Sequence, residues 1–228
     1  MCGRYSLAGP NPAQVRSAYP VTEGLEVRRR YNVAPGDEVL AVTTDRDGRP
    51  RGELLRWGLV PSWARSASSG MKMINARAET LTERPAYRRP FERMRCLILA
   101  DGFYEWQRGA DGRKQPFHIM VRDRPVFAFA GLWSIWHPPE GEPLRTCTII
   151  TTAAGEAIAS LHDRMPVILP REAGQPWLER DRRADELLEL LCGSRDMVLR
   201  PVGSAVNDAR YDGPECLAAP VQAQPSLF

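Results

Sequence analysis

Short apolar runs dominate the middle of the chain, and turns rich in glycine or proline separate them. Runs of about four to eight apolar residues between turn signals are typical of β-strands. Residues 45–49 (Asp-Arg-Asp-Gly-Arg) are a turn-rich connector, so the runs on either side are predicted to pair as a hairpin. The pattern predicts strands at residues 39–44, 53–57, 96–100, 103–107, 116–121, 126–132, 146–152 and 197–202.

Helical signals are fewer and shorter than the strand signals. Asn11-Pro12 is a typical helix start, with asparagine at the cap and proline at the first helical position, and predicts a helix to about Tyr19. Pro85 and Pro90 limit a helical stretch at residues 85–94 to short pieces. Residues 28–35 are expected to form a loop. Further helices are predicted at residues 76–81, 153–161 and 182–192.

The order of these elements indicates the fold class. Helices are inserted among closely spaced short strands, which argues against a doubly wound parallel sheet. We therefore expect an α+β fold, with a curved, mainly antiparallel sheet or open barrel flanked by short helices. No glycine-rich phosphate loop follows a strand, so no nucleotide cofactor is expected. A single domain is expected over residues 1–217, with a flexible tail over residues 218–228.

Composition narrows the class of protein. The 228 residues are 43% hydrophobic and 26% charged, as in ordinary globular proteins. No apolar run approaches the roughly 20 residues that cross a bilayer, and the first residues lack the apolar block of a secretory signal. We expect no membrane association and a cytoplasmic location, with free thiols. The cysteines are Cys2, Cys96, Cys147, Cys192 and Cys216, and no Cys-x-x-Cys pattern predicts a metal site.

Positive charge is concentrated in the first half of the chain. Residues 1–100 contain 17 basic and 10 acidic side chains, and residues 101–228 contain 14 and 18. Such asymmetry favours an anionic partner that is engaged mainly by the first half. Of the 31 basic residues 29 are arginine, whose planar guanidinium matches phosphate and stacks on bases. Codon bias in a GC-rich genome is the alternative explanation.

Cys2 stands directly after the initiator methionine, and small second residues generally permit removal of Met1. An N-terminal cysteine has an amine with a pKa of about 7.7–8.0 and a thiol with a pKa of about 8.5 on adjacent carbons. The amine can act as the base for the thiol, as in N-terminal nucleophile hydrolases. Alternatively, the amine condenses with an aldehyde to an imine and the thiol closes a thiazolidine ring. The residue alone leaves both chemistries open.

Two further side chains are candidates for proton transfer. Glu105 lies between Tyr104 and Trp106 on a predicted strand, where poor solvation would raise the pKa of its carboxyl group. An outward-facing strand residue is the alternative interpretation. His162 follows a predicted helix in a charged loop, where it can donate a proton or a hydrogen bond, or simply cap the helix end.

A third group of side chains suits nucleic acid. Asn75 opens a predicted helix and is a candidate for its cap, and Arg77 one residue inside would direct a guanidinium at an anion. Residues 56–65 interleave arginine with tryptophan, and Trp63 lies in a turn rather than a strand. Stacking of a base on such a ring contributes about 1–3 kcal/mol. Most tryptophans, however, belong to protein cores.

Six short motifs follow one another along the chain: residues 1–5 (MCGRY), 31–36 (YNVAPG), 57–63 (WGLVPSW), 75–80 (NARAET), 100–106 (ADGFYEW) and 161–166 (LHDRMP). In this order they resemble the motifs of the SOS response-associated peptidase (SRAP) family. Weaker similarity continues to about residue 207, and residues after about 217 lie outside it. One departure is that a pair of tryptophans, common in bacterial members, is a single Trp63 here.

The resemblance implies a protein that captures abasic sites in single-stranded DNA covalently and so shields them. Cys2, exposed by removal of Met1, would be the nucleophile that joins the ring-opened sugar as a thiazolidine. Asn75 would position the reacting groups, Glu105 would move protons, and His162 would contact the sugar oxygen. The peptidase activity in the family name would be removal of Met1, and an abasic-site lyase activity is possible through the amine.

The resemblance also implies the partner and its contacts. Single-stranded DNA with abasic sites is the expected partner, bound by a monomer without a metal or organic cofactor. The cytoplasmic protein would then be associated with the nucleoid while it is bound to DNA. Two rival functions are a cysteine peptidase or amidohydrolase with an N-terminal nucleophile, and a noncovalent single-strand binding module. The implied DNA contacts are Arg4, Asn32, Pro35, Trp63, Arg77, Trp106 and Thr151.

Overall fold

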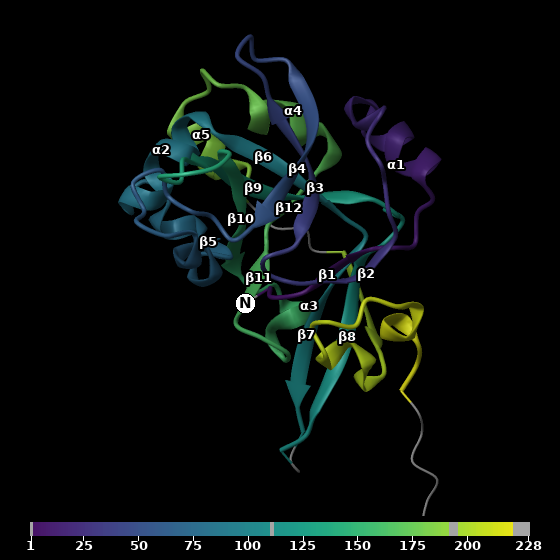
Figure 1. Cartoon of the computed structure of the whole chain (residues 1–228). Coiled ribbons are helices and arrows are strands. Elements are labelled where there is room, and N and C mark those ends of the chain that lie inside the picture. Colours follow the sequence, from purple (N-terminus) through teal and green to yellow (C-terminus); the bar gives the residue numbers. More distant parts are fainter. Residues whose placement is uncertain (1, 110–111, 192–195, 221–228) are drawn as a thin grey trace, which may run out of the picture.

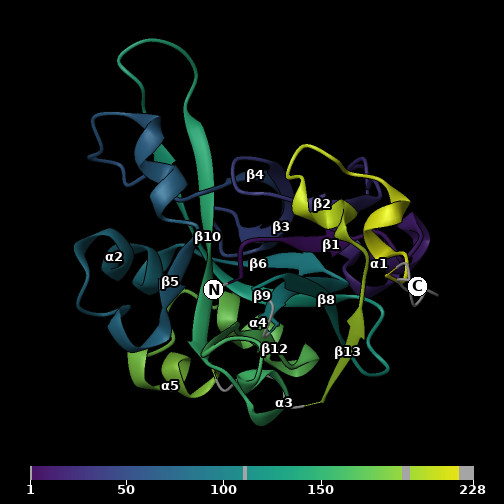
Figure 2. The ribbon, with the colours of Figure 1, turned by 90° about the horizontal axis from the view of Figure 1, so that it is seen from below.

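The computed structural model describes residues 2–109, 112–191 and 196–220, which form two β-sheets flanked by short helices (Figures 1 and 2). The smaller sheet has five strands in the order β13-β8-β7-β1-β2, and each neighbouring pair is antiparallel. Its strands are β1 (Tyr5–Leu7), β2 (Arg30–Val33), β7 (Gly102–Arg108), β8 (Lys114–Val121) and β13 (Met197–Pro201).

The larger sheet has eight strands, and five of them close into a barrel. Strand β10 pairs with both β4 and β9, which completes the ring β10-β4-β3-β6-β9. The ring consists of β3 (Glu38–Thr44), β4 (Pro50–Trp57), β6 (Arg95–Ala100), β9 (Phe127–Trp136) and β10 (Leu144–Ala153). Three short strands join its rim, namely β5 (Asn75–Arg77), β11 (Arg164–Pro166) and β12 (Ile168–Leu169). The expected α+β fold with a curved, mainly antiparallel sheet is confirmed, and the barrel is closed.

Both faces of the barrel strands β3, β6, β9 and β10 are buried along most of their length, whereas β4 alternates buried and exposed residues. In β6, Cys96 and Ile98 join one core cluster with Phe129, to which every strand of the ring contributes. Leu97 and Leu99 point the other way, into a second cluster that the helices complete. Burial on both faces explains why these strands have continuous apolar sequences rather than alternating ones.

Short helices surround the barrel. The prediction at Asn11 is confirmed, because its side chain accepts a hydrogen bond from the Gln14 amide at 2.9 Å while the Gln14 side chain accepts one from the Asn11 amide. No helix in the part of the chain that the structure describes is long and apolar enough to cross a membrane. The α-helices are α1 (Pro12–Ala18), α2 (Pro85–Arg93), α3 (Glu156–Ala159), α4 (Gly174–Leu178) and α5 (Ala184–Glu189). The 3-10 turns are η1 (Pro20–Thr22), η2 (Ala67–Lys72), η3 (Ala78–Thr80), η4 (Arg171–Ala173), η5 (Ser204–Asn207) and η6 (Pro214–Leu217).

All eight predicted strands are present, with shifted ends, but several other predictions are wrong. Residues 28–35 are not a continuous loop, because Arg30–Val33 forms β2 against β1. Residues 76–81 are not an α-helix, because Asn75–Arg77 forms β5 beside β10 and only a 3-10 turn follows. In both places, pairing with a distant strand outweighs the local signal.

Three predicted helices differ in length. Helix α2 runs unbroken through Pro90, whose ring is buried together with Phe91. Helix α3 is limited to Glu156–Ala159, because β10 extends through Ala153. Helix α5 ends at Glu189, and the end predicted at Cys192 lies outside the described residues. Residues 221–228 of the predicted tail also lie outside them. The four described cysteines are free thiols, as expected.

Candidate active site

Cys2 lies just before β1, at the point where the smaller sheet meets the barrel, and it is fully buried. β1 pairs with β7 around Tyr5 and Phe103, so the antiparallel register brings Cys2 toward the part of β7 that carries Glu105. Burial raises the pKa of the Cys2 thiol well above its usual range, and the charge of Glu105 acts in the same direction. The thiol is therefore neutral at physiological pH in this environment.

Asn75 connects β5 to the segment that carries Cys2. Its Nδ2 donates a hydrogen bond to the main-chain oxygen of Cys2 at 2.8 Å, and its own main-chain oxygen accepts one from the Tyr87 hydroxyl at 3.1 Å. Its Oδ1 is buried and has no hydrogen-bond partner among the described residues. Buried acceptors of this kind are uncommon and call for a partner. Asn75 is thus not the helix cap that the sequence suggested but a strand residue directed at Cys2.

Glu105 is buried on β7, with 4% of its surface exposed. Burial raises the pKa of its carboxyl group to about 7, and the charge of Asp163 acts in the same direction. A carboxyl group with this pKa exchanges a proton near neutrality, which suits general acid–base catalysis. This buried environment agrees with the expectation that poor solvation raises the pKa of the Glu105 carboxyl group.

His162 lies in the loop between α3 and β11, beyond the end of β10. Its Nδ1 accepts a hydrogen bond from the Arg164 amide at 2.9 Å and also lies 2.7 Å from the carboxylate of Asp163. One nitrogen cannot accept from the first and donate to the second. We assign the neutral ring with the proton on Nε2, because burial lowers the pKa of His162 and Asp163 is largely exposed to solvent. This tautomer leaves an N–H donor on the other side of the ring.

Strand pairing gathers these side chains around the end of β10. β5 runs parallel to β10 with Asn75 beside Ile149 and Arg77 beside Thr151, and β11 pairs with the same end of β10. Figure 2 shows β5 and β10 side by side. Cys2, Asn75 and Glu105 therefore converge on one point, with the His162 loop next to them. No group of three or more potential metal ligands lies together among the described residues.

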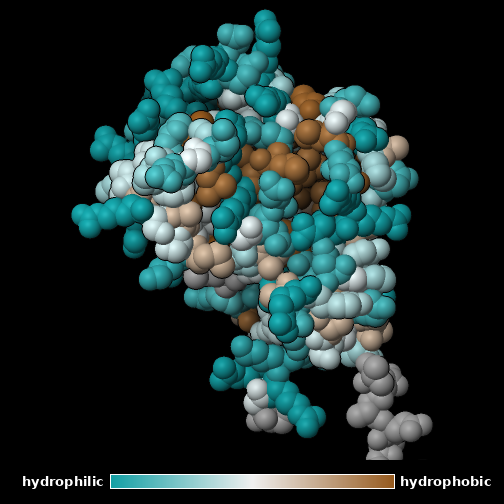
Figure 3. All heavy atoms as spheres, viewed as in Figure 1, coloured by the Kyte–Doolittle hydropathy of each residue, from teal (hydrophilic) through white to brown (hydrophobic). Residues whose placement is uncertain are grey.

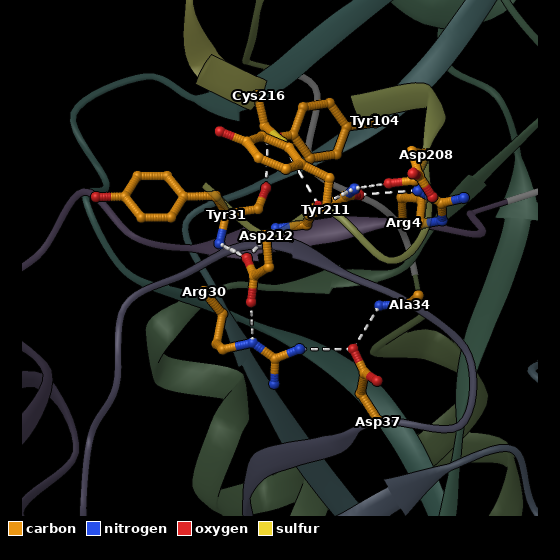
Figure 4. A network of polar contacts seen from close by, with 11 residues as sticks. Arg4, Arg30, Tyr31, Ala34, Asp37, Tyr104, Asp208, Tyr211, Asp212 and Cys216 are labelled. Atoms are coloured by element: carbon orange, nitrogen blue, oxygen red, sulfur yellow. Dashed lines mark hydrogen bonds and ion pairs between the residues drawn. The ribbon is translucent and has the colours of Figure 1, made fainter. Parts of the chain in front are cut away.

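Arg4 and Asn32, two expected DNA contacts, take part in an internal network. Figure 4 shows Arg4 with other members of this network. Arg4 donates from one terminal nitrogen to Asn32 Oδ1 and to the main-chain oxygen of Val206, both at 2.9 Å. Asn32 is buried, and its Nδ2 donates to the main-chain oxygens of Asp208 and Tyr211 at 2.9 and 2.8 Å. This network fastens the C-terminal segment to β1 and β2.

Asp212 extends the same network to the neighbouring strand. Its carboxylate accepts hydrogen bonds from the main-chain amides of Tyr31 and Asn32 at 2.5 and 2.8 Å, and it pairs with the Arg30 guanidinium. Arg30 also pairs with Asp37 at 2.6 Å (Figure 4). The arrangement makes residues 204–217 a strap across the smaller sheet, which the sequence did not suggest.

The remaining expected DNA contacts differ in exposure. Trp63 is 69% exposed, and Arg77 on β5 is also exposed. Trp106 is half-buried and donates from its ring nitrogen to Asn207 at 2.7 Å. Pro35 is half-buried, and Thr151 is fully buried. Direct contact with a ligand is thus open to Trp63, Arg77 and Trp106, whereas the side chains of Asn32 and Thr151 are enclosed in this conformation.

Two polar clusters near the site were missed by sequence reasoning. Ser6 Oγ donates to Asp101 at 2.5 Å and lies 2.8 Å from His118 Nε2, which therefore serves as the donor in that contact. Arg164 forms a two-pronged ion pair with Glu79 at 2.6 and 2.9 Å. Each of these contacts joins two residues that are more than 80 positions apart in the sequence, so no local pattern links them.

A cavity of about 200 Å³ lies apart from these groups. It is lined by β2, β3 and the segment around Val27, and none of the candidate site residues lines it. Figure 3 shows exposed apolar side chains on the face of the molecule seen in Figure 1, and Leu54, which lines the cavity, is 45% exposed. The convergence of titratable groups at Cys2, rather than the size of a hollow, identifies the candidate site.

Known proteins resemble this chain over most of its length. The family model described as "SOS response associated peptidase (SRAP)" matches residues 1–209. The chain is 42% identical over 223 residues to Abasic site processing protein YoqW of Bacillus subtilis, covering 95% of this chain and 99% of that protein. It is 36% identical to Abasic site processing protein HMCES of Gallus gallus, covering 83% of this chain and 66% of that protein.

Solved structures share the fold. A protein from Bacteroides thetaiotaomicron superposes with a TM-score of 0.83 at 24% identity, covering 96% of this chain and all of that one. A phage-related protein from Bordetella bronchiseptica superposes with a TM-score of 0.68 at 28% identity, covering 88% of this chain and 94% of that one. With the family model matching nearly the whole described chain, this protein belongs to the SOS response associated peptidase (SRAP) family.

Proposed function

We propose that this protein processes abasic sites in single-stranded DNA by capturing them covalently through Cys2, after removal of Met1. The observation that carries the proposal is the convergence of Cys2, Asn75 and Glu105 at the end of β10. Condensation of an amine with an aldehyde needs a nucleophilic amine and an acid that expels water, and a carboxyl group with a pKa of about 7 suits the second role. The relatives named abasic site processing proteins support the same substrate.

The reaction assigns a role to each group. The neutral amine of Cys2 attacks the aldehyde carbon of the open sugar, and protonated Glu105 gives its proton to the departing hydroxyl, which leaves as water. The thiol then adds to the carbon of the protonated imine, and its proton returns to the Glu105 carboxylate. One carbon–nitrogen and one carbon–sulfur bond form, and one water is released. The ring persists because water no longer finds a carbon–nitrogen double bond to attack.

The neighbouring residues orient these steps. Asn75 Oδ1 is buried and has no partner among the described residues, and it would accept a hydrogen bond from the amine of the mature chain. His162, neutral with its proton on Nε2, is suited to donate a hydrogen bond to the sugar oxygen and to assist ring opening or release. If the imine stays open, β-elimination from the same amine would give the lyase activity.

The proposed DNA path follows the exposed side chains. Trp63 stands beside an open hollow of about 490 Å³ that Arg65 and Lys72 also line, a combination suited to base stacking and phosphate attraction. Arg77 and Trp106 would continue the path past Cys2. In this proposal Asn32 and Thr151 support the DNA-binding surface without touching DNA, and Pro35 and Arg4 lie at the edge of that surface. A single domain over residues 1–217 and a monomeric state remain part of the proposal.

Intact mass spectrometry of the purified protein tests the proposal. After incubation with an abasic single-stranded oligonucleotide, we expect the mass of the protein without Met1 plus the oligonucleotide, less one water. The variant C2A should form no heat-stable adduct while its amine retains some lyase activity. The control variant C216A removes another buried thiol and should react like the wild type.

Other outcomes would overturn the proposal. A heat-stable adduct of C2A, or a mature chain that still begins with Met1, contradicts capture by Cys2. Release of a peptide or amide product that C2A blocks would favour the amidohydrolase alternative. Binding without any adduct would favour a noncovalent single-strand binding module.

A further inference from the structure

The loop of residues 58–73 carries the two most exposed large apolar side chains among the described residues. Trp63 is 69% exposed and Met71 is 52% exposed, whereas Leu54, the next most exposed, lies outside this loop. Single exposed apolar residues are ordinary on a protein surface, but apolar residues that gather in one place mark a binding site. Trp63 is the only aromatic residue of the loop, so Met71 is its one other large exposed apolar side chain.

The base of this loop is closed by main-chain contacts. The Gly58 amide donates to the Cys147 oxygen of β10 at 2.8 Å, and the Leu59 amide donates to the Met73 oxygen at 3.1 Å. A Cβ on Gly70 would lie 2.4 Å from the main-chain oxygen of Gly58, so the two ends of the loop cross at a distance that only glycine permits. The loop is therefore fixed to the barrel where it begins and ends.

The exposed side chains are also held at their positions. Next to Trp63, the Ala64 oxygen accepts a hydrogen bond from the ring nitrogen of Trp136 on β9 at 2.7 Å. At the other end of the loop, Met71 lies beside Gly36, where an added Cβ would be 3.6 Å from Met71 Sδ. A binding surface that is ordered in advance loses less entropy when its ligand binds. Trp63 and Met71 are thus presented to solvent by a preformed loop.

The charge around the loop fits a polyanion. Arg65 and Lys72 are exposed and line, together with Trp63, the hollow of about 490 Å³. Unpaired bases and phosphates alternate along a single strand, so apolar side chains among cations suit such a ligand. Residues 54–78 contain no acidic side chain, and their basic side chains are Arg56, Arg65, Lys72 and Arg77.

An apolar surface of another protein is the alternative occupant, and the surroundings do not favour it. The centres of protein–protein interfaces are depleted of charged residues, whereas Arg65 and Lys72 lie at the hollow itself. Ser66 and Ser68 also line the hollow and are exposed. Serine hydroxyls, like arginine and lysine, commonly bind phosphate oxygens. The mixture of groups therefore favours DNA.

We propose that Met71 is a second base contact, which forms with Trp63 a preformed platform for unpaired bases beside the abasic site. The inference rests on the function proposed above, which supplies the single strand. Each side chain takes the face of one base, and the thioether of methionine is polarisable and contacts aromatic faces favourably. The platform acts on DNA affinity and leaves the chemistry at Cys2 unchanged.

The test compares two oligonucleotides that differ only in their bases. One is oligodeoxyadenylate, and the other has the same length and phosphates but a tetrahydrofuran spacer in place of every nucleoside. Fluorescence anisotropy gives the affinity of the wild type, W63A, M71A, M71L and the double variant W63A/M71A for each. The control L188A truncates an exposed leucine of α5, outside the loop.

We expect M71A to weaken binding of oligodeoxyadenylate by about 2- to 10-fold and W63A by about 10- to 100-fold. The double variant should show the product of the two losses, because each side chain takes a separate base. M71L keeps an apolar side chain of similar volume and should stay within about 3-fold of the wild type. Neither the base-free oligonucleotide nor L188A should show a change. Because Trp63 and Met71 are exposed, every variant should keep the thermal midpoint of the wild type.

Three results would overturn the inference. If M71A binds oligodeoxyadenylate as tightly as the wild type, Met71 is not a base contact. If M71A weakens the binding of both oligonucleotides alike, the substitution alters the loop and not the stacking. If W63A and M71A reduce self-association in sedimentation velocity and leave DNA affinity unchanged, the surface joins two copies of this chain.

The same experiment separates this inference from the proposed function, because neither oligonucleotide carries an aldehyde. A wild type that prefers oligodeoxyadenylate through Met71 but forms no adduct with abasic DNA would refute covalent capture and leave the platform standing. A wild type that captures abasic DNA, with M71A binding unchanged, would refute the platform alone. A wild type that binds neither oligonucleotide would refute the platform together with the single-stranded partner.

Discussion

Glu105 illustrates at the scale of one residue how burial produces reactivity at a cost in stability. Burial raises the pKa of its carboxyl from the ordinary value of 4.5 to about 7. Between these values the folded protein holds a proton that the unfolded chain has released. The favourable contribution of this group to the free energy of unfolding is therefore fully present below pH 4.5 and is lost as the pH rises through 7. The same proton is the one that the proposed dehydration step consumes.

The variant E105Q separates the two effects. Because its amide is always neutral, E105Q should be more stable than the wild type at pH 8, by at most about 3 kcal/mol, and equal to it near pH 4.5. Urea unfolding at the two pH values measures this difference. Capture should slow by about 100-fold or more, and wild-type capture should decline above pH 7. The control E156Q changes an exposed acid on α3, and a similar gain there would contradict the assignment.

At the scale of elements, the register between β1 and β7 determines where Cys2 lies. β1 is three residues long, and its Ser6 pairs with Gly102 of β7. At this position the Ser6 side chain also contacts Asp101 and His118. Gly102 has no side chain at the place where a Cβ would lie 2.0 Å from His118 Nε2. His118 is buried, and burial lowers its pKa to about 4, so the ring stays neutral. Displacing the ring would break its hydrogen bond with Ser6.

The variant G102A should therefore disturb this register. We expect a loss of about 1–3 kcal/mol in the free energy of unfolding, as for other overpacked cores, together with slower capture. Thermal and urea unfolding measure the first effect, and single-turnover crosslinking measures the second. G203A is the matched control, because the atoms nearest to its added Cβ lie at an ordinary 3.7 Å. Wild-type stability and capture in G102A would show that the register is set elsewhere.

The way in which an element is stabilised determines whether the sequence predicts it. The barrel strands were predicted because burial on both faces leaves an apolar run, as in β6. β5 was predicted as a helix, because asparagine before a polar run is also a typical cap, and only β10 makes it a strand. The motifs identified Cys2 and Asn75, but the pair of Arg164 and Glu79 depends on a fold that brings β11 beside η3.

At the scale of the whole molecule, charge is distributed unevenly over the fold. The first 100 residues, with 17 basic and 10 acidic side chains, include β5 and α2 beside the candidate site. Arg77 is exposed there and has no ion pair among those recorded for the described residues. The second half is net acidic and supplies the strap of residues 204–217 that binds Arg4. The basic side is thus the side from which a polyanion would approach Cys2.

The variant R77Q tests this orientation. Each phosphate contact on a single strand contributes about 0.7 to the slope of log affinity against log salt, so R77Q should weaken binding and flatten the slope by that amount. Fluorescence anisotropy with intact single-stranded DNA at several salt concentrations measures it. R122Q makes the same change of charge at an exposed arginine in the second half, where it pairs with Asp196, and should leave the slope unchanged. Equal slopes for R77Q and R122Q, both lower than that of the wild type, would mean that DNA responds to net charge alone and that the strand does not pass beside β5.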